Sequence, residues 1–117
     1  MIRAIDRIKE QYPSIEISSK NAKNKDKASE CRWLYSKDLP RRGNVFLEVW
    51  DHTAKLKDVI DYVVYKELLV EDDYKQASEI VAENSKRVTL RYCGTTEYQM
   101  LEFVTKRIER YLEINKK

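Results

Sequence analysis

Residues 30–50, ECRWLYSKDLPRRGNVFLEVW, decide the fold because two segments of alternating side chains flank a short polar connection. In the first segment every second side chain is a thiol or an aromatic ring, namely Cys31, Trp33 and Tyr35. In the second segment every second side chain is aliphatic, namely Val45, Leu47 and Val49. A period of two residues is typical of β-strands, and the proline and glycine between the segments are common in turns. The stretch therefore predicts a β-hairpin.

Glu48 is unusual in this hairpin because it is an acidic residue within an otherwise apolar segment. The two-residue period places it on the same side as Phe46 and Trp50, away from the aliphatic side chains. A carboxylate on a half-buried strand faces water, pairs with a cation such as Arg32 on the neighbouring strand, or binds a divalent metal. The sequence leaves these three alternatives open.

The spacing of apolar residues predicts the other elements, because a period near 3.6 indicates a helix and a period of two indicates a strand. The predicted helices span residues 1–11, 53–70, 72–81 and 97–115, and the further strands span residues 14–18 and 86–93. Thr96 and Gln99 fit a capping box at the start of the last helix. The element order is α-β-β-β-α-α-β-α. It indicates an α/β protein of the α+β kind, with a small mixed or antiparallel sheet that contains the hairpin and is covered by helices.

Length and composition predict one domain over residues 1–117, because a chain of 117 residues with 42% hydrophobic residues can bury a core without disulfides or metals. Cys31 and Cys93 lie far apart and lack the CxxC spacing, so we expect reduced structural thiols. The N-terminal residues lack the apolar stretch of a signal peptide, and no apolar run of about 18 residues occurs. We therefore expect a soluble, cytoplasmic protein that does not enter a membrane.

The charges are unevenly distributed along the chain. Residues 20–42 carry a net charge of +5, which exceeds the +3 of the whole chain, whereas residues 71–83 carry −4. The basic residues of the first segment are Lys20, Lys23, Lys25, Lys27, Arg32, Lys37, Arg41 and Arg42. We expect an electrostatically polar molecule.

The hairpin combines these cations with aromatic rings, which suggests a binding site for DNA or RNA. Single-stranded nucleic acids are bound where aromatic faces stack on bases and cations contact phosphates. The expected site consists of Lys20, Lys23, Lys25, Lys27, Arg32, Trp33, Tyr35, Lys37, Arg41 and Arg42, and it requires no cofactor and no catalysis. In the alternative interpretation, the rings pack in the core and the cations form a solvated rim.

The order helix, three strands, helix, strand in the first 93 residues resembles the common core of the PD-(D/E)XK nuclease superfamily. This resemblance implies that Asp38 and Glu48 hold Mg²⁺ and that Glu10 on the first helix completes the carboxylate set. Carboxylate oxygens are suitable ligands for Mg²⁺, which lowers the pKa of bound water. Trp50 occupies the position two residues after the glutamate where the family has a lysine. Such a nuclease would need a lysine from elsewhere in the chain.

A third interpretation is a protein–protein interaction module. Tyr62, Tyr65 and Leu69 flank the apolar stripe of the predicted helix 53–70, so this helix would be apolar on more than one side. It would be covered by a second copy, which gives a homodimer, or be buried between the sheet and the other helices. His52 is the only histidine, which excludes metal sites that need two histidines from one chain, and we expect it at the surface.

Overall fold

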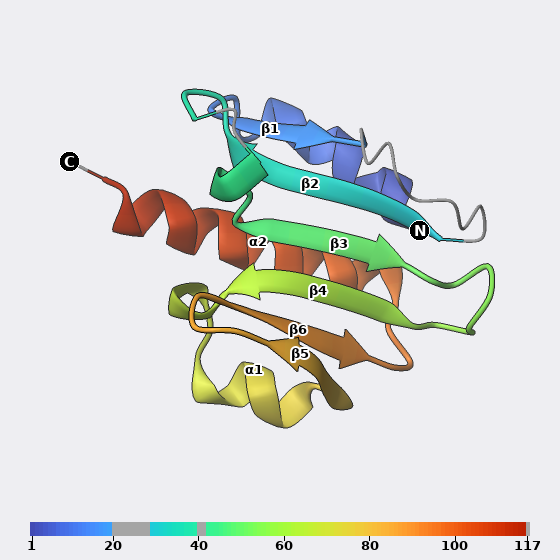
Figure 1. Ribbon diagram of the computed structural model, residues 1–117. Coiled ribbons are helices and arrows are strands. Elements are labelled where there is room, and N and C mark those ends of the chain that lie inside the picture. Colours follow the sequence, from blue (N-terminus) through green and yellow to red (C-terminus); the bar gives the residue numbers. More distant parts are fainter. Residues whose placement is uncertain (20–28, 40–41, 117) are drawn as a thin grey trace.

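The computed structural model describes residues 1–19, 29–39 and 42–116, with only the backbone described for Arg42. The described residues form one six-stranded sheet in the order β1-β2-β3-β4-β6-β5, and every neighbouring pair is antiparallel (Figure 1). The strands are β1 (Ile15–Ser18), β2 (Glu30–Ser36), β3 (Leu47–Asp51), β4 (Ile60–Tyr65), β5 (Glu79–Glu83) and β6 (Arg87–Tyr92). The predicted α+β class is confirmed, and the sheet is antiparallel rather than mixed.

The helices that pack on the sheet lie on one of its faces. The 3₁₀-helix η1 (Ile2–Glu10) lies behind β1 and β2, and the long helix α2 (Glu97–Ile114) lies behind the central strands (Figure 1). The short helix α1 (Glu71–Gln76) lies near β5, and the one-turn 3₁₀-helices η2 (Arg42–Asn44) and η3 (Lys66–Leu68) lie at one end of the sheet. In the described part of the chain, only the one-turn helix η2 touches the opposite face, at the end where Tyr65 and Arg87 bind Gly43, and we call this the open face.

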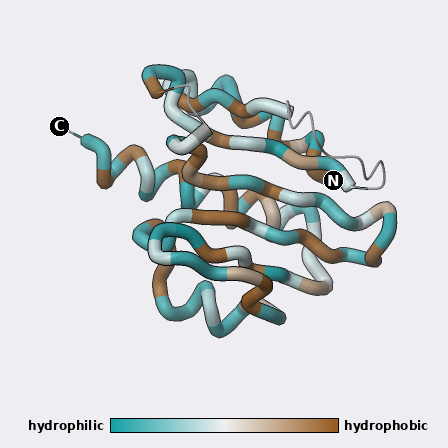
Figure 2. The backbone as a smooth tube through the Cα atoms, viewed as in Figure 1, coloured by the Kyte–Doolittle hydropathy of each residue, from teal (hydrophilic) through white to brown (hydrophobic). Residues whose placement is uncertain are grey.

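The core lies between the sheet and the two covering helices. Alternate strand residues point to it, so hydrophobic and hydrophilic positions alternate along the strands (Figure 2). The central strands contribute Leu47, Val49, Tyr62, Val64 and Leu90, each no more than 1% exposed. Helix α2 contributes Met100, Val104 and Ile108, spaced four residues apart so that all lie on one helix face.

The hairpin and the last helix are where the sequence predicts them. β2 and β3 pair with Leu34 opposite Leu47 and Cys31 opposite Trp50. The capping box is also confirmed, because Thr96 Oγ1 accepts the Gln99 N–H at 3.1 Å and Gln99 Oε1 accepts the Thr96 N–H at 3.0 Å. Strong local signals thus define both elements.

The predicted helix 53–70 is wrong, because its central residues form strand β4. Residues 59–65 are a nearly continuous apolar run, which fits either a helix or a strand that is paired on both sides. Pairing with β3 and β6 decides for the strand. Tyr62 and Tyr65 are buried within this chain, so they do not form the predicted homodimer surface on a helix.

The predicted helix 72–81 is also wrong in its second half. Helix α1 ends at Gln76, Ala77 is extended, and β5 follows as the edge strand. Ile80 and Val81, expected to face the core, are 51% and 43% exposed. The register shifts between Ile80 and Ala82, which is a β-bulge in the pairing with β6.

Phe46 does not share a face with Glu48 and Trp50, as the alternation predicted. It precedes β3, is fully buried, and its ring stacks on Tyr111 of α2 with centroids 3.9 Å apart. Strand β3 begins only at Leu47, so the alternation of side chains between the two faces does not include Phe46. Glu48 and Trp50 do lie on the open face.

We expect Phe46→Ala to lower the free energy of unfolding by about 3–5 kcal/mol, because it leaves a cavity beside Tyr111. The measurement is urea denaturation followed by circular dichroism. Tyr98→Ala is the matched control, because Tyr98 is 74% exposed. It should change stability by no more than about 0.5 kcal/mol. Equal losses in the two variants would contradict the placement of Phe46.

Asp51 links η1 to the end of β3. Its Oδ2 accepts the Ile2 N–H at 3.0 Å, and its Oδ1 accepts the Thr53 N–H at 2.9 Å and the Thr53 hydroxyl. Burial alone would raise the pKa of this carboxyl group, but the hydrogen bonds from Thr53 and Ile2 outweigh burial. They lower the pKa below its ordinary value of 3.8.

Because its pKa is lowered, the Asp51 carboxylate stabilises the fold at pH values above the ordinary pKa. This contribution should disappear as the pH falls through the pKa of Asp51 in the folded state. We expect Asp51→Asn to be less stable than the wild type near neutral pH. The difference should shrink between about pH 5 and pH 2, where the wild-type carboxylate takes up a proton. Unfolding free energies measured across this range test the prediction, and a constant difference would oppose it.

Candidate functional site

The open face carries aromatic and charged side chains in rows that cross the strands. One row follows the pairing Cys31–Trp50–Asp61–Arg91 across β2, β3, β4 and β6. The next row consists of Ser18, Trp33, Glu48, Val63 and Thr89. Beyond it, Tyr35 lies beside Glu16, and Tyr65 lies beside Arg87. This face is the candidate site because it brings together most of the predicted aromatic side chains.

Three of these side chains, Trp33, Tyr35 and Trp50, form what we call the aromatic strip. Trp33 and Tyr35 are two residues apart on β2, and Trp50 lies diagonally across from Trp33 on β3. All three are partly exposed. Diagonal neighbours on one sheet face are about 7–8 Å apart, within reach of large rings. The aromatic strip is therefore a partly accessible surface outside the core.

The structure answers the question that Glu48 raised. Its Oε1 accepts the Trp50 indole N–H at 3.0 Å, and Trp33 and Val63 are its cross-strand neighbours. It does not pair with Arg32, because Arg32 is opposite Val49, the next residue of β3, and therefore points to the other face of the sheet. The carboxylate thus holds the Trp50 ring in place on the open face.

Arg32, predicted to contact nucleic acid, lies on the helix-covered face. Its Nε and Nη2 donate to the two carboxylate oxygens of Asp6 at 3.0 and 3.2 Å, and its Nη1 donates to the Cys31 carbonyl at 3.0 Å. Arg32 is only 8% exposed. A buried guanidinium requires such partners, so Arg32 ties β2 to η1 and is not part of the aromatic strip.

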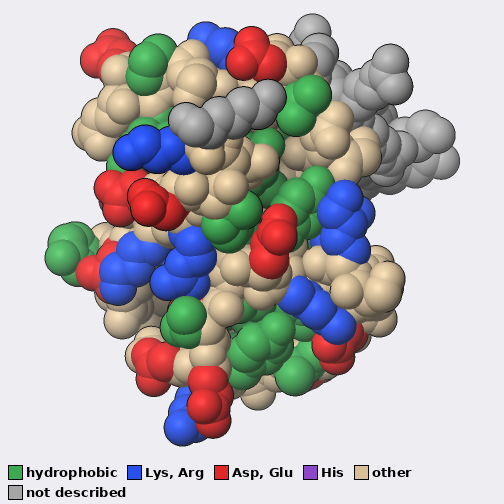
Figure 3. Space-filling view, turned by 90° about the vertical axis from the view of Figure 1, so that its left-hand side faces the viewer, with side chains coloured by type: hydrophobic (Ala, Val, Ile, Leu, Met, Phe, Trp, Pro, Cys, Tyr) green, Lys and Arg blue, Asp and Glu red, His purple; other side chains and the backbone are tan. Residues whose placement is uncertain are grey.

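The remaining predicted cations are only partly placed. Lys37 is exposed just beyond the end of β2. The predicted residues Lys20, Lys23, Lys25, Lys27 and Arg41 lie outside the described residues, as does the side chain of Arg42. At the end of the sheet seen in Figure 3, Lys and Arg side chains are mixed with Asp and Glu side chains and do not form one basic patch.

The structure does not bring together the predicted metal ligands. Glu10 ends η1 on the covered side, Asp38 is exposed beyond β2, and Glu48 lies in the middle of β3 on the open face. Among the residues that the structure describes, no group of three or more His, Cys, Asp or Glu side chains could hold a metal ion.

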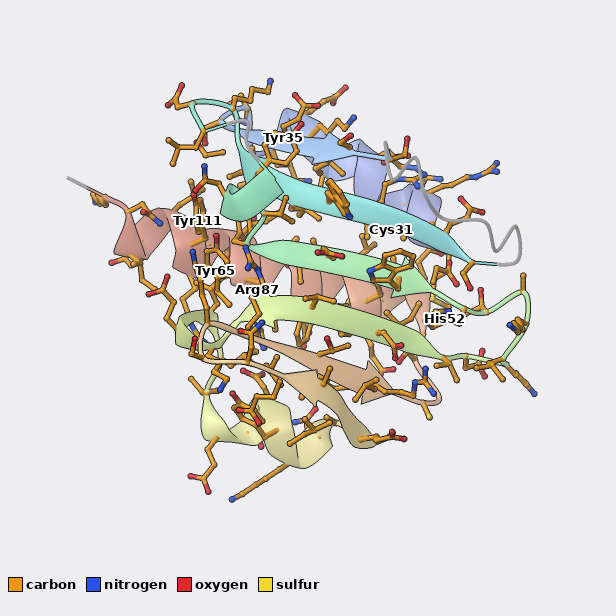
Figure 4. The ribbon with its side chains drawn as sticks, in the orientation of Figure 1. Cys31, Tyr35, His52, Tyr65, Arg87 and Tyr111 are labelled. Carbon is orange, nitrogen blue, oxygen red and sulfur yellow. The ribbon has the colours of Figure 1, made fainter. Side chains whose placement is uncertain are left out.

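A chain of hydrogen bonds that the sequence did not suggest lies at one end of the open face. Ser29 Oγ is 2.8 Å from His52 Nδ1, and His52 Nε2 is 3.0 Å from Asp61 Oδ2. Asp61 also accepts from Arg91 Nε and Nη2 at 2.8 and 3.0 Å, and these bonds raise the pKa of the guanidinium. His52 lies only partly at the surface, since its side chain is 18% exposed and contacts two other side chains. Figure 4 shows His52 at this end and Arg87 at the other.

The order serine, histidine, aspartate is that of hydrolytic triads, but two features differ. The serine here contacts Nδ1, whereas triads use Nε2, and the charge of Asp61 is already matched by Arg91. The arrangement instead connects the start of β2, the β3–β4 connection, and β6. We interpret it as a structural link that holds the end of the sheet together.

No helix in the described ranges is both long and apolar enough to cross a membrane. Comparisons with protein-family models, curated proteins and solved structures found no match to this chain.

We expect His52→Ala and Asp61→Ala to be coupled, because the two side chains share a hydrogen bond. A double-mutant cycle measured by chemical denaturation should give an interaction energy of about 0.5–3 kcal/mol. As a control, His52→Ala combined with Lys106→Ala on α2 should be additive within about 0.5 kcal/mol. If the first cycle is as additive as the second, the hydrogen bond contributes nothing to stability.

Proposed function

We propose that this protein binds single-stranded nucleic acid on its open face, with bases stacked on the aromatic strip. The observation that carries the proposal is the grouping of three partly exposed rings, Trp33, Tyr35 and Trp50, on a sheet face that no long helix of the described residues covers. Stacking of a base on an aromatic side chain contributes about 1–3 kcal/mol and tolerates any sequence.

The geometry of Glu48 supports this proposal. Because its carboxylate accepts the indole N–H of Trp50, the ring is held in one orientation before a ligand arrives. A ring that is already ordered loses less conformational entropy on binding, so more of the stacking energy is retained. The same carboxylate is also an acceptor for amino groups on base edges, such as N4 of cytosine.

The charges of the open face imply that stacking dominates and that phosphate contacts are few. Among the described residues of this face, carboxylates outnumber guanidinium groups, namely Glu16, Glu48, Asp61 and Glu79 against Arg87 and Arg91. Arg91 is paired with Asp61, and Arg87 Nη2 donates to the Gly43 carbonyl at 2.8 Å. The face is therefore not a basic surface.

The sequence provides cations for the phosphates close to the residues of the aromatic strip. Lys37 follows the strand that carries Trp33 and Tyr35, and four lysines occur in the sequence between β1 and β2. With only a few phosphates neutralised, the slope of log K against log salt concentration should be about −1 to −3.

Intrinsic fluorescence tests the proposal directly, because both tryptophans of the chain belong to the aromatic strip. We expect single-stranded DNA or RNA oligonucleotides to quench this fluorescence. Trp33→Ala and Trp50→Ala, assayed by fluorescence anisotropy of labelled oligonucleotides, should each weaken binding by about 5- to 150-fold. Tyr98→Ala removes an exposed ring on α2 and should leave the affinity unchanged.

Circular dichroism should verify that each variant remains folded. The proposal is overturned if the wild type binds no oligonucleotide at low salt, or if folded Trp33→Ala and Trp50→Ala variants bind as tightly as the wild type.

A further inference from the structure

A cavity of about 270 Å³ lies on the opposite side of the sheet from the aromatic strip. It is bounded by α1, the turn between β6 and α2, and the first turns of α2. Gly94, with φ of +70°, forms this turn, a left-handed conformation that glycine adopts without strain. Tyr62 and Phe103 form part of the wall, their rings stacked with centroids 3.9 Å apart. The cavity thus borders the core at Tyr62 and Phe103.

A buried cation with an unused donor lines this cavity. Arg107 is only 3% exposed, its Nη2 donates to Asp73, and its guanidinium lies over the Phe103 ring at 4.2 Å. Its Nε has no hydrogen-bond partner among the described residues. Buried polar groups are normally hydrogen-bonded, because leaving one unsatisfied costs about 1–3 kcal/mol. Nε itself is covered in this structure, so an acceptor atom in the cavity would remove that cost once a small shift of the Arg107 side chain exposes Nε.

Carboxylates on two helices also line the cavity. Asp72 on α1 accepts the Gln76 side-chain amide at 2.7 Å, and Glu102 on α2 pairs with Lys106 at 3.4 Å. Both are exposed, so they retain lone pairs for a further donor. The lining therefore combines a buried guanidinium with two accessible carboxylates.

We propose that this cavity binds a zwitterionic small molecule of amino-acid size. Its carboxylate or carbonyl oxygen accepts from Arg107, and its ammonium group donates to Asp72 and Glu102. A simple anion would meet carboxylates on both helices, and a simple cation would meet Arg107 and Lys106. A ligand with both charges satisfies both. The volume is just below the range of about 300–1,000 Å³ typical of sites for drug-sized ligands, which favours a smaller molecule.

Cys93 provides a reporter at the site, because it is exposed and lines the cavity, whereas Cys31 is buried. A coloured thiol reagent should react with Cys93 in the folded protein, and a bound ligand should slow that reaction. We would measure the rate with each of the common amino acids, and with acetate and methylamine as compounds that carry only one of the charges. At ten times its Kd, a ligand that blocks access should slow labelling about tenfold.

We expect at least one amino acid to protect Cys93, and acetate and methylamine to protect it much less. Asp72→Asn and Glu102→Gln change exposed side chains and should each weaken protection at least several-fold. Arg107→Lys should weaken it further, because the forked donor is lost. Glu113→Gln, on α2 but outside the cavity lining, is the control and should leave protection unchanged.

The proposal is overturned if no amino acid slows labelling, or if acetate or methylamine protects as well as the best amino acid. It is also overturned if Asp72→Asn and Glu102→Gln leave protection intact. The Asp72 and Glu102 variants keep the test decisive even if the Arg107 variant does not fold.

Discussion

The packing of α2 against the inward faces of β3, β4 and β6 is the contact on which the rest of the structure depends. Burying each large aliphatic side chain there contributes about 1.5–3 kcal/mol, and Val104 and Ile108 are completely enclosed. Because α2 and η1 share one face, strand geometry assigns nearly every strand residue either to the core or to the open face. Neighbouring residues such as Arg32 and Trp33 thereby receive opposite roles.

Charged side chains that this arrangement buries, wholly or in part, form ion pairs with specific partners. Arg32 is paired with Asp6 beneath the sheet, and Asp61 with Arg91 on the open face. Removing one member of a buried pair costs far more than the pair contributes, because an uncompensated charge remains. Arg107 is matched only in part, since Asp73 pairs with one nitrogen and Nε has no hydrogen-bond partner in the described part of the chain. Arg107 therefore differs from Arg32 and Arg91, because it retains a hydrogen-bond donor for a further partner.

The sequence predicts those parts of the fold whose signals are local. The hairpin has strict alternation, and the last helix has its capping box and apolar stripe within its own residues. Strand β4 could not be distinguished from a helix, because its apolar run fits both periods and only pairing with β3 and β6 decides. The aromatic strip followed from alternation. The His52 contacts did not, because Ser29 and Asp61 are 23 and 9 residues away.

The bulge in β5 has a consequence for how copies of this chain behave at high concentration. β5 is an edge strand with two large exposed aliphatic residues, a combination that favours intermolecular sheet growth. The extra residue between Ile80 and Ala82 interrupts the regular backbone pattern that an incoming strand would need. In an antiparallel pair of two such edges, Glu79 and Glu83 would face each other and repel. The bulge and these charges therefore oppose the pairing of one β5 edge with another.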